Sequence, residues 1–240
     1  MGRAVLPDMA LTFPARFNGP PDSANGGYAS GALAQLAPGD TVEVTLRRPP
    51  PLNVLLRVES EDTRYTLTDQ QGQTVAVAEP VIEKFDDLEP AVAGFEFDAP
   101  PVFTDREHPF RTCFTCGPDR APGDGLRIFS RRVPGREVLA DRWTPDASLT
   151  GIDGLVHPEF VWAALDCPSG WAAYDRLTPG EIAVLGRMTA TIHRRPAAQE
   201  PCQIVSWARE RDGRKVKAGA ALYTSDGELM AAARTVWISL

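Results

Sequence analysis

Two short segments of the chain carry residue types that can do chemistry, and each supplies what the other lacks. Asn25-Gly26-Gly27-Tyr28 begins an apolar run that continues through Ala34, nine residues after Asn25. His157-Pro158-Glu159-Phe160 begins a second run, which reaches Asp166 nine residues after His157. The first run has a glycine pair but no carboxylate, and the second has a carboxylate but a proline where the first glycine stands. This complementarity predicts that the two segments are halves of one active site.

The start of a helix suits the stabilisation of a developing oxyanion, because its first backbone N–H groups are unpaired and lie at the positive end of the helix dipole. Gly26 and Gly27 fit that role, since glycine also lets a substrate approach the backbone closely. Pro158 has no N–H and cannot donate at the corresponding place. Asp166 can act as a general base toward water or as a nucleophile.

Asp166 also has a surrounding sequence that favours function. The preceding residues, Phe160 to Leu165, are apolar. An unpaired carboxylate buried there costs free energy or shifts its pKa. An aspartate at such a place is more often functional or tightly hydrogen-bonded than incidental.

Hydrophobic periodicity predicts the same order of elements in both halves of the chain, a helix followed by antiparallel strands, which is an α+β plan. We expect helices over 26–37 and 157–174, with Pro168 kinking or ending the second. Strands are expected at 10–17, 41–46, 55–60, 65–68 and 74–82, and then at 127–132, 138–143, 183–193, 203–210, 215–223 and 229–240. The segment between the halves is rich in Pro, Gly, Asp and Arg, as linkers are.

Composition sets limits on function. The 240 residues are 43% apolar and 24% charged, as in soluble globular proteins. A net charge of -7 argues against a nucleic-acid partner, because phosphate contacts need a basic face. No apolar stretch approaches the roughly 20 residues of a membrane span, and the first ten residues lack the apolar core of a secretory signal. We therefore expect a cytoplasmic protein with no membrane partner.

Four cysteines are too few for a disulfide scaffold in a chain of this size. Cys113 and Cys116 form a single Cys-x-x-Cys, and a structural zinc site usually has two such pairs. Zinc held with His108 and Cys167 is the alternative, and a redox pair is less favoured. We expect the segment from Cys113 to Leu126 to bind no metal and to pack as a connector near the second half of the chain.

At these motifs the chain resembles hotdog-fold thioesterases. The second half is similar to the phenylacetate-pathway type, in which a His begins the central helix and an Asp follows nine residues later, as His157 and Asp166 do. Cys113-x-x-Cys116-Gly117 followed by Gly125-Leu126 is also similar to a segment of that type. The first half resembles acyl-CoA thioesterases with two fused units, in which an Asn/Gly-Gly-Tyr turn opens the helix.

The resemblance implies two fused hotdog units, each a long central helix wrapped by an antiparallel sheet. The units would be residues 1–100 and 127–240, joined by a connector at 101–126. It also implies a composite site, with the oxyanion amide from one unit and the carboxylate from the other. Gly26 and Gly27 would then work with Asp166, and the counterpart made by Pro158 and Ala34 would be inactive.

The expected activity is hydrolysis of an acyl-CoA or related acyl thioester, without a cofactor and with a homodimer as one expected assembly. The expected substrate-binding residues are Asn25, Tyr28, His157, Trp162 and Ser169. Two alternatives stay open. One is a protein that binds an acyl-CoA without turnover, and the other is a hydratase or dehydratase with His157 as the base.

Overall fold

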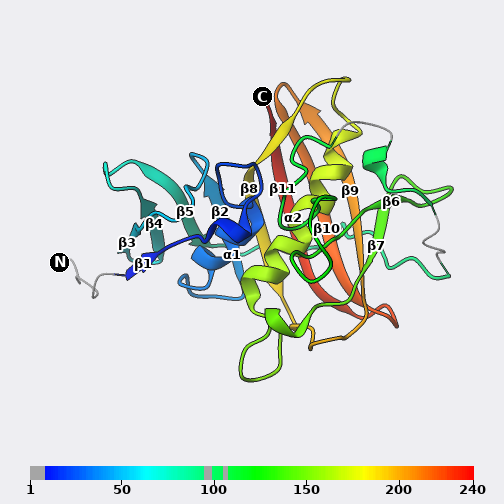
Figure 1. Ribbon diagram of the computed structural model, residues 1–240, viewed down its shortest axis with the longest axis horizontal. Coiled ribbons are helices and arrows are strands. Elements are labelled where there is room, and N and C mark those ends of the chain that lie inside the picture. The colour runs from blue at the N-terminus through cyan, green and yellow to red at the C-terminus, as the bar shows by residue number, and fades with distance from the viewer. Residues whose placement is uncertain (1–8, 95–98, 105–107) are drawn as a thin grey trace.

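The structure, a computed structural model, describes residues 9–94, 99–104 and 108–240. Within these residues two α-helices, α1 (Gly26–Ala34) and α2 (Pro158–Tyr174), lie on one face of a large twisted sheet (Figure 1). The helix α1 contacts strands of the first half and β8, whereas α2 contacts strands of the second half. Short 3₁₀ turns occur at Ala15–Phe17, Val102–Thr104 and Ala147–Leu149.

The sheet has eleven strands in the order β1-β3-β4-β5-β2-β8-β11-β10-β9-β7-β6, and every neighbouring pair is antiparallel. In the first half the strands are β1 (Met9–Leu11), β2 (Thr41–Leu46), β3 (Leu56–Glu61), β4 (Arg64–Thr68) and β5 (Thr74–Pro80). In the second half they are β6 (Arg131–Arg132), β7 (Leu139–Trp143), β8 (Ala183–Ile192), β9 (Cys202–Asp212), β10 (Lys215–Thr224) and β11 (Leu229–Ser239).

The two halves join at the pair β2–β8, where Val42 lies opposite Ala190 and Val44 opposite Met188. In β2 the burial alternates along the strand, so that Val42 and Val44 face the helices. This alternation is the period-2 pattern expected of a strand with one buried face. The sheet is therefore continuous from one half to the other.

The two helices pack directly on each other, and glycines make the close approach possible. A Cβ on Gly27 would lie 2.5 Å from the Cβ of Asp166, and one on Gly31 would lie 2.7 Å from the Cα of Glu159. Each helical glycine costs about 1 kcal/mol relative to alanine, so its presence here is explained by helix contact. Since Gly27 meets Asp166 and Gly31 meets the earlier Glu159, the helices run antiparallel.

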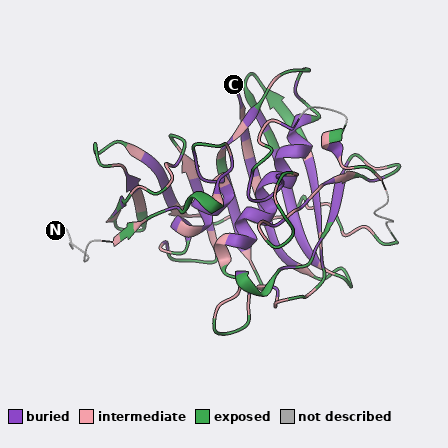
Figure 2. Ribbon diagram, in the orientation of Figure 1, coloured by how far each residue is buried: buried purple, intermediate pink, exposed green. Residues whose placement is uncertain are grey.

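Nearly all of α2 is buried, from Phe160 through Tyr174 (Figure 2). The sequence predicts that the helix kinks or ends at Pro168. The helix continues through Pro168 to Tyr174, so the prediction of an end there is wrong. Burial of nearly every residue of α2 outweighs the one backbone hydrogen bond that Pro168 cannot donate. In the described part of the chain, no helix is both long enough and apolar enough to cross a membrane.

The segment after β5 crosses the outer face of the sheet, the face opposite the helices. Arg234 of β11 pairs with Glu83 and with Asp87, whose carboxylate is 2.6 Å away. Tyr223 Oη donates to the Glu89 carbonyl at 2.6 Å. A second apolar cluster lies beneath this segment, which therefore covers a sheet surface that would otherwise be exposed; it includes Val205, Trp207, Ala221, Tyr223 and, from the segment itself, Leu88, Ala91 and Val92.

Most expected strands are present within one or two residues, and three elements differ. The helix expected at 26–37 ends at Ala34, because the next amides, Leu36 and Ala37, bond three residues back and tighten the last turn. The strand expected at 10–17 ends at Leu11, and Pro14 then leads into the 3₁₀ turn at Ala15–Phe17.

The strand expected at 127–132 pairs only at its last two residues. Before these residues the backbone hydrogen-bonds to a side chain and not to a neighbouring strand, since the Phe129 amide donates to the carboxylate of Asp141.

Candidate active site

The centre of the site is a hydrogen bond that joins the two helices. The backbone amide of Gly27, in the first turn of α1, donates to Oδ2 of Asp166 in the middle of α2 at 2.9 Å. The absent side chain of Gly27 allows this approach, since a Cβ there would overlap Asp166. The two segments thus meet at Gly27 and Asp166, residues that lie 139 positions apart in the sequence.

Asp166 is 2% exposed, and its second carboxylate oxygen, Oδ1, has no hydrogen-bond partner among the described residues. Burial raises the pKa of Asp166 to about 7, against the Gly27 amide, which lowers it. A buried carboxylate oxygen without a partner is free to accept a hydrogen bond from water or from a bound molecule.

The start of α1 holds two further groups. Asn25 caps the helix, because its Oδ1 accepts from the Tyr28 amide at 2.9 Å. The Gly26 amide comes next, and no described residue accepts a hydrogen bond from it. Since Gly27 is occupied by Asp166, the expectation that both glycines donate to an oxyanion is narrowed to Gly26.

A cavity of about 270 Å³ opens beside these groups. Gly26, Asn25 and Asp166 line it, so the start of α1 and the middle of α2 border the same cavity. Much of the remaining wall is apolar and comes from both halves of the chain, including Leu46, Leu185, Trp171 and Trp237. Neither Ala34 nor Pro158 belongs to its lining.

Two adjacent arginines, Arg47 and Arg48, also line the cavity, and both are exposed. They follow the last residue of β2 directly, and the Pro49-Pro50-Pro51 run fixes the chain after them. No acidic partner of either side chain occurs among the described residues. Sequence reasoning missed this pair, although an Arg-Arg-Pro-Pro-Pro run at a strand end was a visible signal.

Three cysteine thiols lie against the cavity. Cys113 and Cys116 come from the connector and Cys167 from α2, and all three are buried. Hydrogen bonds from the thiols of Cys116 and Cys167 hold the pKa of Cys113 well below its usual range. The connector therefore packs against both halves of the chain, because the Phe114 amide donates to the Asn18 carbonyl before α1 and Thr115 Oγ1 donates to the Ala163 carbonyl of α2.

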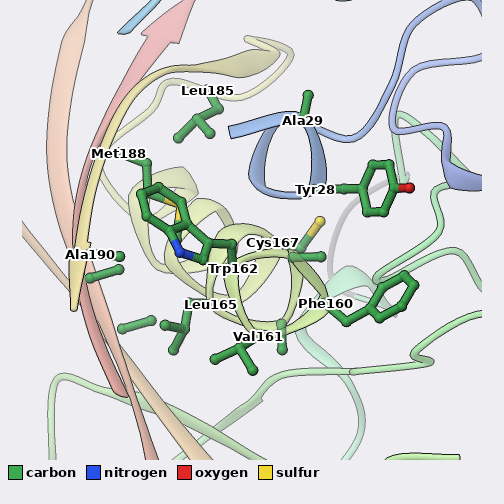
Figure 3. Packing of buried hydrophobic residues seen from close by; sticks show 14 of the residues in the cluster. Tyr28, Ala29, Phe160, Val161, Trp162, Leu165, Cys167, Leu185, Met188 and Ala190 are labelled. Atoms are coloured by element: carbon green, nitrogen blue, oxygen red, sulfur yellow. The ribbon is translucent and has the colours of Figure 1, made fainter. Parts of the chain in front are cut away.

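The remaining predicted binding residues, Tyr28, His157, Trp162 and Ser169, do not line the cavity. Tyr28 stacks on Phe17 with ring centroids 4.4 Å apart, and burial raises its pKa to about 12. Trp162 lies among the buried side chains that α2 turns toward β8 (Figure 3).

The remaining two, His157 and Ser169, have structural surroundings that account for them without a ligand. His157 is exposed at the start of α2, where its side chain makes no capping hydrogen bond. Ser169 Oγ accepts from Thr235 Oγ1 and from Trp237 Nε1, each at 3.0 Å, and so fastens α2 to β11.

No protein-family model matches the sequence, and no curated protein matches it. Solved structures resemble the chain over its whole length. A tesB protein of Mycobacterium avium subspecies paratuberculosis has a TM-score of 0.65 at 14% identity, covering 100% of this chain and 95% of that one. A conserved protein of unknown function with a hot dog fold, from Alicyclobacillus acidocaldarius, has a TM-score of 0.63 at 13% identity, covering 100% and 94%.

A third similar structure is the acyl-CoA thioesterase II TesB2 of Mycobacterium marinum. It has a TM-score of 0.56 at 12% identity, covering 84% of this chain and 80% of that one. At such identities a likeness speaks to the fold and not to the activity. The chain has the fold of the hotdog thioesterases.

Proposed function

We propose that the protein hydrolyses an acyl-CoA or a related acyl thioester at a composite site made by the start of α1 and the middle of α2. One observation carries the proposal, the hydrogen bond between the Gly27 amide and the Asp166 carboxylate at the wall of an apolar cavity. It sets a carboxylate beside the free Gly26 amide at a helix start, and these are the two groups that thioester hydrolysis requires.

In the proposed reaction the acyl chain lies in the cavity and its carbonyl oxygen accepts a hydrogen bond from the Gly26 amide. Asp166 Oδ1 takes a proton from a water molecule as the water oxygen bonds to the carbonyl carbon. Negative charge then develops on the carbonyl oxygen, where the Gly26 amide and the positive end of α1 stabilise it. When the C–S bond breaks, protonated Asp166 returns the proton to the sulfur, and the products are a carboxylic acid and a free thiol.

We further propose that the chain consists of two hotdog units, residues 1–100 and 127–240, and that one site is live. The repeated order of helix and strands in each half supports this, as does the antiparallel contact of α1 with α2. The absence of Ala34 and Pro158 from the cavity lining supports an inactive counterpart.

Arg47 and Arg48 support a phosphorylated carrier, coenzyme A, as the thiol part of the substrate. Both are exposed at the cavity, and guanidinium groups bind phosphate oxygens bidentately. We expect Arg48→Ala to raise KM for an acyl-CoA roughly tenfold, since a charged hydrogen bond contributes on the order of 1.5 kcal/mol. The same acyl group on pantetheine, which carries no phosphate, should keep its KM. An equal change for both substrates would exclude this role. Arg57→Ala is the control for charge alone, since Arg57 is exposed on β3 and does not line the cavity.

A screen of purified protein against acyl-CoAs of different chain length and aryl content tests the activity, with release of free thiol followed by its reaction with a disulfide dye. The proposal expects turnover of some of these thioesters and its loss in Asp166→Asn. Asparagine keeps an oxygen that can accept from the Gly27 amide, so the helix contact is preserved while the base is removed. Turnover by Asp166→Asn at the wild-type rate would refute the role of the carboxylate.

The second candidate is a protein that binds an acyl-CoA without turnover. The observation in its favour is that Asp166 is 2% exposed with one carboxylate oxygen already bonded to Gly27. It predicts saturable binding of an acyl-CoA in calorimetry with no release of thiol. The hydratase or dehydratase alternative needs His157 at the cavity, and His157 does not line it.

A further inference from the structure

The three cysteines beside the cavity form one compact cluster of sulfur atoms. The Sγ atoms of Cys113, Cys116 and Cys167 all lie within 4.8 Å of one another, and those of Cys113 and Cys167 are 3.5 Å apart. A tight turn holds the first two, because the Gly117 amide donates to the Cys113 carbonyl at 2.8 Å. A Cβ on Gly117 would lie 2.5 Å from that carbonyl oxygen, so the turn depends on glycine.

The Asn25 side chain points at two of these sulfurs. Asn25 Nδ2 donates to Cys167 Sγ at 3.6 Å and to Cys113 Sγ at 3.8 Å. A donor placed in this way stabilises sulfur as thiolate. Several thiolates in one buried place require a positive charge among them.

The dimensions suit a metal ion better than a disulfide. At a metal–sulfur distance of about 2.3 Å, tetrahedral geometry separates neighbouring thiolates by about 3.8 Å. The Sγ–Sγ distance is 3.5 Å between Cys113 and Cys167, and no pair is farther apart than 4.8 Å, so the sulfurs are spaced about as such a site requires. A disulfide needs about 2.05 Å and would use only two of the three sulfurs.

His108, which the sequence offers as a fourth ligand, has both ring nitrogens in other hydrogen bonds. Its Nδ1 accepts from the Phe110 amide at 3.1 Å, so its Nε2 carries the proton and donates to the Cys116 carbonyl at 2.9 Å. Neither ring nitrogen can therefore coordinate a metal. The three cysteines line the cavity, and the fourth direction is left to water or to a molecule bound there.

From this geometry we propose that Cys113, Cys116 and Cys167 bind one soft divalent transition-metal ion, zinc by the chemistry of its ligands, as a three-thiolate site open to the cavity on its fourth side. Binding releases the thiol protons to solvent as the sulfurs coordinate. The expectation that the connector binds no metal rested on a single Cys-x-x-Cys, and the fold adds Cys167 from α2 as a third sulfur. The proposal does not depend on the thioesterase activity.

The test is metal analysis of untagged full-length protein, produced with zinc in the medium and purified without chelator. We expect about one zinc per chain in the wild type and a loss of at least tenfold in Cys113→Ser and in Cys167→Ser. Cys202→Ser is the matched control, since Cys202 is buried in β9, lies outside the cluster and contacts Met230. It should retain the full zinc content.

A second measurement uses the wild-type chain alone, in case a variant does not fold. Protein stripped with a chelator is titrated with Co²⁺, which gives intense visible bands in tetrahedral sites and a thiolate charge-transfer band in the near ultraviolet. Saturation at about one equivalent supports the proposal. Absence of zinc together with absence of the cobalt bands overturns it, as does zinc retained in both cysteine variants. Two thiols missing on titration of the denatured metal-free protein would show a disulfide and overturn it equally.

Discussion

Replacement of Gly26 by proline removes the backbone N–H at the start of α1, and comparison with alanine, which adds a Cβ but keeps the N–H, isolates the effect of that donor. Gly26 is the first residue of the helix, a position where proline is favourable, and Asn25 before it is extended with ψ 130°. The Gly26 amide has no acceptor among the described residues, so its removal breaks no hydrogen bond of the fold. The chain itself accommodates proline at the corresponding position, Pro158 of α2. We therefore expect Gly26→Pro to fold.

Loss of one oxyanion donor costs about 10²- to 10³-fold in kcat, or about 2.7–4 kcal/mol of transition-state stabilisation. We expect a loss of this size in the steady-state rate of thiol release, with little change in KM. The matched control is Gly26→Ala, which keeps the N–H and adds a Cβ that would lie 2.9 Å from both Cβ and Cδ2 of Leu185. The proline variant adds a Cβ at the same place, so this crowding is common to both variants. The alanine variant should therefore turn over at least roughly tenfold faster than the proline variant, because it keeps the donor. Equal rates for the proline and alanine variants would refute the assignment of Gly26 as the donor.

Three further substitutions test the helix pair. Asp166→Asn should lower kcat roughly 10²- to 10⁴-fold while calorimetry still detects substrate binding, and loss of binding would instead indicate a structural role. Gly31→Ala should lower the free energy of unfolding in urea by about 1–3 kcal/mol, because its Cβ would lie 2.7 Å from Glu159 Cα; a gain would mean that helix propensity outweighs packing. Ala34→Ser and Pro158→Gly should leave turnover nearly unchanged, and a large loss in either would contradict a single live site.

The strands were predictable because each has one buried face and therefore alternates along its length. In β2, Val42 and Val44 are buried between partly exposed polar residues, and the predicted bounds agree with the observed Thr41–Leu46. Prediction failed where a side chain replaced a strand as the partner of the backbone. Asp141 accepts from the Phe129 amide, and a bond between residues twelve positions apart leaves no periodic trace in the sequence.

The pairing of Gly27 with Asp166 was predictable in outline, because a glycine pair and a buried carboxylate are both unusual at their places. Which of the two glycines donates to Asp166 was not predictable. It depends on the antiparallel crossing of α1 and α2, which brings Gly27 and not Gly26 to within 2.9 Å of the carboxylate. The sequence indicates the cysteine cluster only as an alternative, with His108 added to it. Cys167 lies 54 residues from Cys113, and the two meet because the connector packs against α2, where Thr115 Oγ1 donates to the Ala163 carbonyl.

The two ends of the helix pair differ in ways that point in one direction. At one end Gly27 bonds to Asp166, the Gly26 amide has no acceptor in the described chain, and the cavity adjoins both residues. At the other end Gln35 Nε2 bonds to Glu159 at 2.9 Å, so polar side chains of the two helices satisfy each other. An unpaired amide, a buried carboxylate and a cavity each lower the stability of the fold. Catalysis needs all three in one place. Their presence together at one end, beside a cavity that neither Ala34 nor Pro158 lines, is what selection for a single site would leave.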